Sequence, residues 1–184
     1  ALMHFDISNF IELKTFGFAT GGSGLGGSAS FLLSLISSIS KAFEINISKK
    51  DLIEKACFLE INKLKKPIGK QDQYLCANKG FRSFTFFNNN TVRENPISMQ
   101  KKKTLERLSN DFYLIPTFKK RKSDSVLKKI IKDNESLEKI MKIRKIAEKF
   151  ISFDDERDYK IQELFHNSIK ESWLIKKSLA EVMT

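Results

Sequence analysis

A glycine-rich loop is the feature of this sequence best suited to chemistry. Residues 21–30, GGSGLGGSAS, hold five of the eight glycines of the chain and stand directly before the apolar run FLLSLIS. Small residues let backbone N–H groups approach an anion, and a helix start adds partial positive charge. We therefore predict a phosphate-binding loop in which the Ser28 hydroxyl reaches a phosphate oxygen or its metal ion. A glycine turn that only packs is the alternative.

Neither standard nucleotide motif accounts for this loop. Gly22, Gly24 and Gly27 satisfy the dinucleotide pattern GxGxxG, but about 20 residues further on, where a second strand is required, FEINISKKDL is typical of a turn and a helix start. A Walker A loop ends in Gly-Lys-Ser/Thr, whereas no lysine occurs between Lys14 and Lys41. The expectation therefore rests on backbone amides at a helix start, which both motifs share.

The first of two candidate carboxylates is Glu60, on the apolar face of a helix that we predict over residues 49–65. Ser48 followed by Asp51 resembles a capping box and starts this helix. A carboxylate on a buried face costs free energy unless a cation or donor meets it, and Mg²⁺ with phosphate is such a partner. A plain salt bridge is the alternative. The face consists of Ile53, Ala56, Cys57 and Leu64.

The second candidate is Asp72, in the polar segment GKQDQY that we predict to be a loop. Lys70 and Gln71 precede it and are candidates for substrate binding. A carboxylate in such a loop can accept a proton from a hydroxyl or orient that hydroxyl, although a loop cap is the simpler alternative. Together with the glycine loop and Glu60, Asp72 outlines phosphoryl transfer, with an anion cradle, a metal carboxylate and a base.

The elements that must position these groups indicate an α+β fold. We expect strands at residues 9–16, 80–87, 92–98 and 111–118, with an Asn-rich turn between the middle two, and helices at residues 28–43 and 49–65. From Ser125 onward the apolar spacing is helical throughout. We place a boundary between residues 95 and 110, which gives predicted domains 1–100 and 101–184.

Composition limits the classes of protein that fit. A net charge of +11 favours phosphates, acidic metabolites or nucleic acid, and 41% hydrophobic residues suffice for a core. Cys57 and Cys76 lack metal-site spacing, so we expect reduced, buried thiols. The sequence shows neither a bilayer-spanning stretch nor a signal peptide, and Lys119–Lys122 reads as a solvated basic loop without a nucleic-acid motif around it. We expect a cytoplasmic protein without nucleic-acid or membrane partners.

Four segments, in order along the chain, resemble the GHMP sugar kinases. GGSGLGGSAS is similar to the family's second motif, Pro-x-x-x-Gly-Leu-Gly-Ser-Ser-Ala. KPIGKQDQY with GFRSFTF, TFKKRKSDSVL and KESWLIKKSL are similar to segments of one branch, the D-glycero-D-manno-heptose 7-phosphate kinases. The resemblance implies an ATP- and Mg²⁺-dependent sugar kinase of carbohydrate metabolism, acting on heptose 7-phosphate, and we consider a homodimer as its assembly.

The resemblance also implies roles for particular residues. Ser28 and Glu60 match the Mg²⁺ ligands, Asp72 matches the aspartate proposed to take the proton of the sugar hydroxyl, and Arg121 matches an arginine near the substrate phosphate. The nucleotide phosphate loop is formed by Gly22, Ser23, Gly24, Leu25, Gly26, Gly27 and Ser28. By the same resemblance, a ribosomal-protein-like N-terminal domain precedes a ferredoxin-like C-terminal domain with added helices.

The chain departs from the family pattern at several points. The loop lacks the usual proline, Gly27 replaces the first of the paired serines, and Phe118 and Lys119 replace a glycine and an apolar residue. The family's Gly-Gly-Gly-Thr-Asp segment and its glycine-rich third motif do not occur in these 184 residues. We therefore expect both domains to be incomplete and the sugar pocket of these residues alone not to be competent.

Three alternatives remain open. One is a GHMP kinase for another small hydroxylated substrate. Another is a catalytically degenerate protein of the same fold that binds nucleotide without turnover. The third is a basic nucleic-acid-binding module, which would bind any polyanion in a salt-sensitive way.

Overall fold

The computed structural model describes residues 11–17, 24–113, 115, 134–154 and 157–181. These residues fall into two compact units, the first ending at Lys79 and the second starting at Gly80. The predicted domains 1–100 and 101–184 stay predictions.

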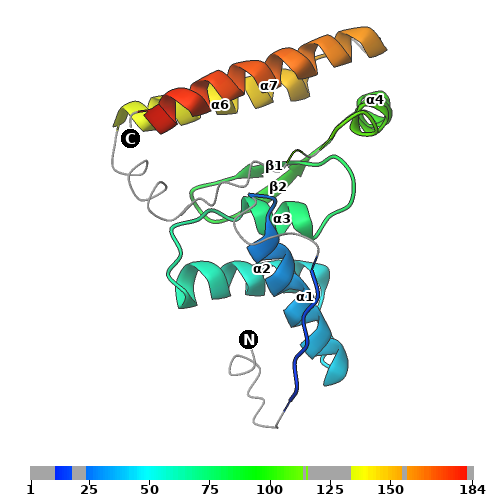
Figure 1. Ribbon diagram of the computed structural model, residues 1–184, viewed down its shortest axis with the longest axis vertical. Helices are drawn as coiled ribbons and strands as arrows, with labels where there is room; N and C mark the ends of the chain where they lie inside the picture. Colours follow the sequence, from blue (N-terminus) through cyan, green and yellow to red (C-terminus); the bar gives the residue numbers. More distant parts are fainter. Residues whose placement is uncertain (1–10, 18–23, 114, 116–133, 155–156, 182–184) are drawn as a thin grey trace. The chain divides into compact units, whose positions relative to one another are not determined.

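The first unit is a small cluster of helices (Figure 1). Helix α1 spans Gly27–Ala42, α2 spans Lys49–Cys57, a π-helix η2 spans Phe58–Lys63, and α3 spans Gln71–Cys76. The core forms where α1 packs against α2 and α3, and Leu59 of η2 joins this core. Its buried members are Leu32, Leu33, Ile36, Ile53, Ala56, Cys57 and Leu59.

Helix α2 and its continuation η2 confirm the predicted helix 49–65. The helix changes from α-helical to π-helical form at Phe58. Ser48 caps α2 by accepting a hydrogen bond from the Asp51 amide at 3.1 Å. From Phe58 the backbone widens, and the Leu64 amide donates to the Leu59 carbonyl, five residues back. The expectation that Leu64 shares the buried face is wrong, since its side chain is 62% exposed. An α-helical spacing does not continue through a π-turn.

Three further expectations for this unit are corrected. The segment with Asp72 is not a loop, because Gln71–Cys76 form α3, and an acidic residue suits the first turn of a helix. No strand forms at residues 11–16, the described part of the predicted strand 9–16, and these residues are exposed with no neighbouring strand to pair with. Cys57 is buried as expected, but Cys76 is exposed. The predicted helix 28–43 is confirmed by α1.

The second unit contains a β-hairpin and three helices. Strands β1, Ser83–Phe86, and β2, Val92–Asn95, pair antiparallel, with Phe84 opposite Glu94. Asn90 has a left-handed φ of 64° in the turn between them. This hairpin confirms the predicted strand pair and its Asn-rich turn.

Helix α4, Met99–Ser109, was not predicted, and it occupies the expected domain boundary. Ser98 caps it by accepting a hydrogen bond from the Lys101 amide at 3.2 Å. The predicted strand 111–118 is wrong for its described residues, because 111–113 and 115 have no strand partner. Phe112 instead stacks on Phe165, with 6.1 Å between ring centroids.

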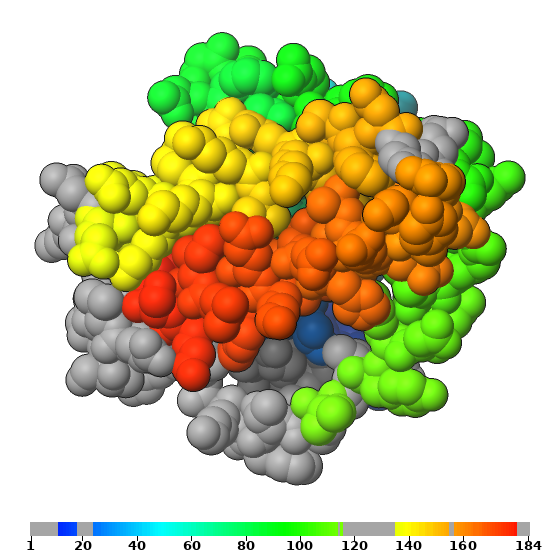
Figure 2. Space-filling model, turned by 90° about the horizontal axis from the view of Figure 1, so that it is seen from above, coloured from blue at the N-terminus to red at the C-terminus, as the bar shows by residue number. Residues whose placement is uncertain are grey.

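The remaining helices form an antiparallel pair. Helix α6, Asn134–Ser152, and helix α7, Asp158–Glu181, lie side by side, with the end of α7 beside the start of α6 (Figures 1 and 2). Helix α4 also packs on α7, where Leu105 and Ile161 are buried. The predicted helical second half is confirmed in this part, whereas residues 125–133 lie outside the described ones.

The mixture of helices with a small two-stranded sheet is compatible with the predicted α+β class. The ribosomal-protein-like and ferredoxin-like domains stay predictions. Across the described ranges, every helix is too short or too polar to cross a bilayer.

Candidate functional site

The end of the glycine loop is held against the start of α3. Gly26 is the N-cap of α1 and has a φ of 68°, a left-handed conformation that favours glycine. A Cβ atom placed on Gly26 would lie 2.9 Å from the Cys76 sulfur and 3.9 Å from the Asp72 Cβ atom. Glycine is therefore required both by conformation and by space. This close approach places Asp72 beside the loop.

The first turn of α1 leaves backbone donors available for an anion. The first helical hydrogen bond runs from the Ser30 amide to the Gly26 carbonyl at 2.9 Å, so the amides of Gly27, Ser28 and Ala29 precede it. No side chain caps this turn and no acidic residue lies in it. The arrangement suits the phosphate binding predicted for Gly24–Ser28. Gly22 and Ser23 lie outside the described residues.

Glu60 is the centre of the site. It lies in η2, is 1% exposed, and receives hydrogen bonds from three other segments. The Ser28 hydroxyl and the Lys66 ammonium both donate to its Oε1 atom, the latter at 2.8 Å, and the Gln73 amide donates to Oε2 at 2.5 Å. Lys66 also donates to the Ser28 oxygen at 2.7 Å. The buried carboxylate is thus ionised, paired and bridged to the glycine loop.

The pKa of Glu60 reflects two opposing influences. Burial raises it, but the hydrogen bonds from Lys66, Ser28 and Gln73, with the positive charge of Lys66, outweigh burial and bring the pKa below its ordinary value. Although Cys76 is exposed overall, partial desolvation of its sulfur and the negative charges of Asp72 and Glu60 raise the pKa of its thiol. Both candidate carboxylates therefore lie close enough to influence one sulfur atom.

Lys66 and Gln73 are the members of this site that sequence reasoning missed. Lys66 follows Glu60 by six residues, a separation that α-helical periodicity does not connect. The connection is made just after the π-helix ends, where Lys65 has a left-handed φ of 53° and the Lys66 amide donates to the Glu60 carbonyl at 3.0 Å. Gln73 lies in the quoted motif KQDQY, beside Asp72, and is completely buried. Its place in that motif, directly after Asp72, was the available signal.

The predicted substrate residues Lys70 and Gln71 lie apart from the Glu60 carboxylate. The Lys70 ammonium pairs with Glu54 of α2 at 3.1 Å, and the Tyr74 hydroxyl donates to the same carboxylate. Burial raises the pKa of Glu54, but these two bonds and the charge of Lys70 bring it below its ordinary value. Gln71 is exposed. Arg121 lies outside the described residues.

The donor set fits Mg²⁺ that arrives with a nucleotide. A serine hydroxyl and a carboxylate are hard oxygen ligands, and Mg²⁺ commonly uses one or two carboxylates with substrate phosphates and water. The same two oxygens already hold a cation, the Lys66 ammonium. No group of three or more His, Cys, Asp or Glu side chains with metal-site geometry occurs among the described residues. Ser28 and Glu60 would therefore need the nucleotide to complete the coordination.

A pocket of about 470 Å³ lies beside the start of α1 in the same unit. It lies between residues 13–17 and α1, and Gly27 and Ser30 lie at its edge near the loop. Its volume leaves room for a flat ring, and apolar side chains line the space next to the first turn of α1. They are Leu13, Phe16, Phe31 and Leu35.

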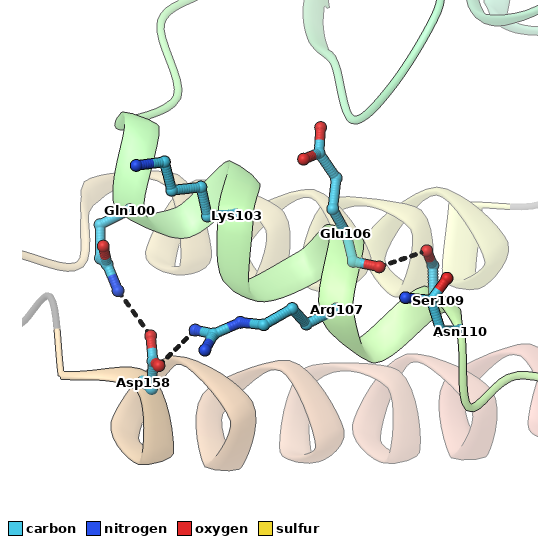
Figure 3. A pocket seen from close by; sticks show the side chains of 7 residues that line it. All are labelled: Gln100, Lys103, Glu106, Arg107, Ser109, Asn110 and Asp158. Atoms are coloured by element: carbon cyan, nitrogen blue, oxygen red, sulfur yellow. Dashed lines mark hydrogen bonds and ion pairs between the residues drawn. The ribbon is translucent and has the colours of Figure 1, made fainter.

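A second pocket, in the second unit, is a shallow opening at the contact between two helices. It lies between α4 and the start of α7 and has a volume of about 680 Å³. Gln100 and Arg107 point toward Asp158, the first residue of α7, and bond to it (Figure 3). Both groups are thus used in holding α4 on α7. None of the predicted site residues lies there.

The comparisons with known proteins concern the part of the chain that holds the site. Residues 5–80 match the family model described as the GHMP kinases N terminal domain, and the match ends where the first compact unit ends. Searches of curated proteins and of solved structures gave no match. The match includes Ser28, Glu60 and Asp72, and it suggests a kinase. The similarity is thus one of this part of the chain, less than half of its length, to the N-terminal domain of the GHMP kinases.

Proposed function

We propose that this protein is an ATP-dependent sugar kinase that transfers the γ-phosphoryl group of ATP to a hydroxyl of a sugar or phosphosugar. The observation that carries the proposal is the convergence of the glycine loop, Glu60 and Asp72 within the unit that matches the kinase domain. The resemblance of KPIGKQDQY and GFRSFTF favours D-glycero-D-manno-heptose 7-phosphate as the acceptor, at its anomeric hydroxyl.

The residues divide the work of phosphoryl transfer. The amides of Gly27 and Ser28 bind the phosphates at the helix start, and the apolar pocket beside α1 takes the base of the nucleotide. Ser28 and Glu60 would hold Mg²⁺, which would supply positive charge to offset the charge of the phosphates. Asp72 aligns the acceptor hydroxyl and takes its proton as the oxygen forms its bond to phosphorus and the bond to ADP breaks. Lys70, Gln71 and Arg121 remain candidate contacts to the substrate.

The exchange of Asp72 for Asn tests this mechanism. The longest natural form of this chain is supplied with Mg-ATP and with heptose 7-phosphate, hexose phosphates or free sugars, and ADP release is measured. Asp72→Asn is expected to lower turnover at least about 100-fold, because it removes general base catalysis, while ATP affinity stays nearly unchanged. The matched control is Asp154→Asn, at an exposed carboxylate of the second unit. Retained turnover in Asp72→Asn excludes Asp72 as the base.

A catalytically degenerate nucleotide-binding protein is the second candidate. It is favoured by Gly27, which stands where the resembling kinases have a serine, and by the Lys66 ammonium on the candidate metal ligands. It predicts ATP binding without ADP release across the panel. Turnover with any one phosphosugar excludes it. The cytoplasmic location and the homodimer belong to the proposal as well.

A further inference from the structure

Lys66 places a positive charge on both candidate metal ligands. Its ammonium lies 2.7 Å from the Ser28 oxygen and 2.8 Å from Glu60 Oε1. Because Glu60 is 1% exposed, its charge requires a cation before any metal arrives. Lys66 is the cation that meets this requirement. No other Lys or Arg is paired with Glu60 among the described ion pairs.

A metal ion on the same two oxygens would compete with this ammonium for space and charge. Mg²⁺ contacts its oxygen ligands at about 2.0–2.1 Å, so it cannot share the gap between Ser28 and Glu60 with a second cation. A lysine side chain is flexible, and its ammonium group is strongly hydrated, so the group is stable in water once it leaves the site. Metal binding therefore requires the ammonium to leave.

The Lys66 side chain can move into solvent while the backbone and the other residues of the site stay in place. Its side chain is 31% exposed, so the ammonium has access to solvent. Its backbone is anchored separately, because the Lys66 amide donates to the Glu60 carbonyl at 3.0 Å, and Pro67 follows. Only the side chain has to move. Gln73 keeps its bond to the other oxygen of Glu60, so the carboxylate stays oriented.

We infer that Lys66 is an exchangeable cation that holds Ser28 and Glu60 in position when no metal is bound and is displaced when Mg²⁺ binds. This inference rests on the proposed kinase function, because it takes Ser28 and Glu60 as the metal ligands. It makes Lys66 a positioning residue that also sets the metal affinity. Removing its charge strengthens metal binding, and a guanidinium in its place weakens it, because Arg binds a carboxylate through two parallel hydrogen bonds.

Binding of Mn²⁺, used as a probe for Mg²⁺, tests the inference on the whole chain by electron paramagnetic resonance, with and without ATP. Lys66→Met is expected to bind Mn²⁺ about tenfold more tightly than the wild type, since a charge-assisted bond no longer competes. Lys66→Arg is expected to bind it more weakly. The control is Lys65→Met, which removes the same charge from an exposed neighbour. Its Mn²⁺ affinity is expected to stay within about twofold of wild type.

Unchanged or weaker Mn²⁺ binding in Lys66→Met, relative to Lys65→Met, overturns the inference. If Lys66→Met does not fold, Lys66→Arg decides, and unchanged or tighter binding there overturns it. If ADP is released but Lys66→Met and Lys66→Arg bind Mn²⁺ as tightly as the wild type does, the exchange of cations is rejected and the proposed kinase function is retained. Failure of the wild type to bind either ATP or Mn²⁺ rejects both.

Discussion

Two carboxylates in this molecule, Glu60 and Asp158, each accept hydrogen bonds from one cationic side chain, one hydroxyl and one glutamine amide, but they differ in burial. Glu60 in the first unit is bonded by a lysine, a serine hydroxyl and a glutamine amide. Asp158 in the second unit is bonded by Arg107, the Thr104 hydroxyl at 2.6 Å and the Gln100 amide at 2.6 Å. The chemistry of the donors alone therefore does not identify a functional site.

Burial and neighbours separate the two clusters. The Glu60 side chain is 2% exposed and the Asp158 side chain 37%. Asp158 begins α7, where a carboxylate suits the helix terminus and its donors come from α4, so packing explains the whole arrangement. Glu60 lies inside a π-turn, its partner Ser28 begins α1, and Asp72 lies beside the adjoining loop. Packing alone gives no reason to bury a charge there.

Removal of each charge should show the largest difference between the clusters. Glu60→Gln keeps the shape but turns an amide toward Gln73, which leaves a buried donor unpaired, so the first unit is expected to lose about 3 kcal/mol of stability. Asp158→Asn, at an exposed position, is expected to change the second unit less. Hydrogen exchange read by mass spectrometry reports each unit of the whole chain. Equal losses in both units would remove the distinction drawn from burial.

One left-handed glycine from each unit, Gly26 and Gly80, sharpens the comparison at the level of the backbone. Gly26→Ala combines an unfavourable φ of 68° with a contact of 2.9 Å to the Cys76 sulfur, so a loss of about 2–3 kcal/mol is expected. At Gly80, with a φ of 70°, an added Cβ atom would meet only the Glu106 Oε1 atom, at 3.9 Å, among the described residues, so Gly80→Ala is expected to cost about 1–2 kcal/mol.

A second substitution separates conformation from contact at Gly26. Cys76→Ala removes the sulfur, so adding it to Gly26→Ala should recover part of the loss. Thermal unfolding of the single and double variants gives the coupling. Additive effects would mean that the loop and α3 do not press on one another.

In the first unit, the sequence predicted which residues lie at the site better than it predicted how they contact one another. Ser28, Glu60 and Asp72 were predicted from residue types and a resemblance, and the structure brings them into one region. Lys66 was missed because the turn at the end of the π-helix, which carries no signature in hydrophobic spacing, connects it to Glu60. In the second unit, α4 was missed because its Lys-rich surface hides its periodicity. Asp158 was missed because only tertiary packing brings α4 to α7.

The glutamines give a smaller contrast. Gln73 is completely buried, and its Oε1 atom has no hydrogen-bond partner within the described part of the chain. Gln73→Met removes a donor to Glu60 and that unpaired oxygen together, so a net loss of about 1 kcal/mol is expected. Gln100→Met should cost less, because Gln100 is only half-buried and Arg107 stays on Asp158. Denaturant unfolding of both variants compares them, and a larger loss at Gln100 would contradict the ranking.

Acid should act on the exposed cluster by the smallest amount. The hydrogen bonds from Thr104 and Arg107 are the main causes that keep the pKa of Asp158 below its ordinary value, and the bond from Gln100 and the charge of Arg107 add to them. Lys103 and Glu106 are the other charged groups around the pocket. Because the pKa of Asp158 is lowered in the folded state, its charge stabilises that state at pH values above the pKa of an unfolded aspartate, about 3.9. This stabilisation is lost as the pH falls through the pKa of the folded state. Hydrogen exchange in α4 and the start of α7 should therefore accelerate below about pH 4 in the wild type beyond the change seen in Asp158→Asn. The same acceleration in both proteins would mean that other carboxylates govern the acid response of this unit, and the likeness between the two clusters would then be one of composition alone.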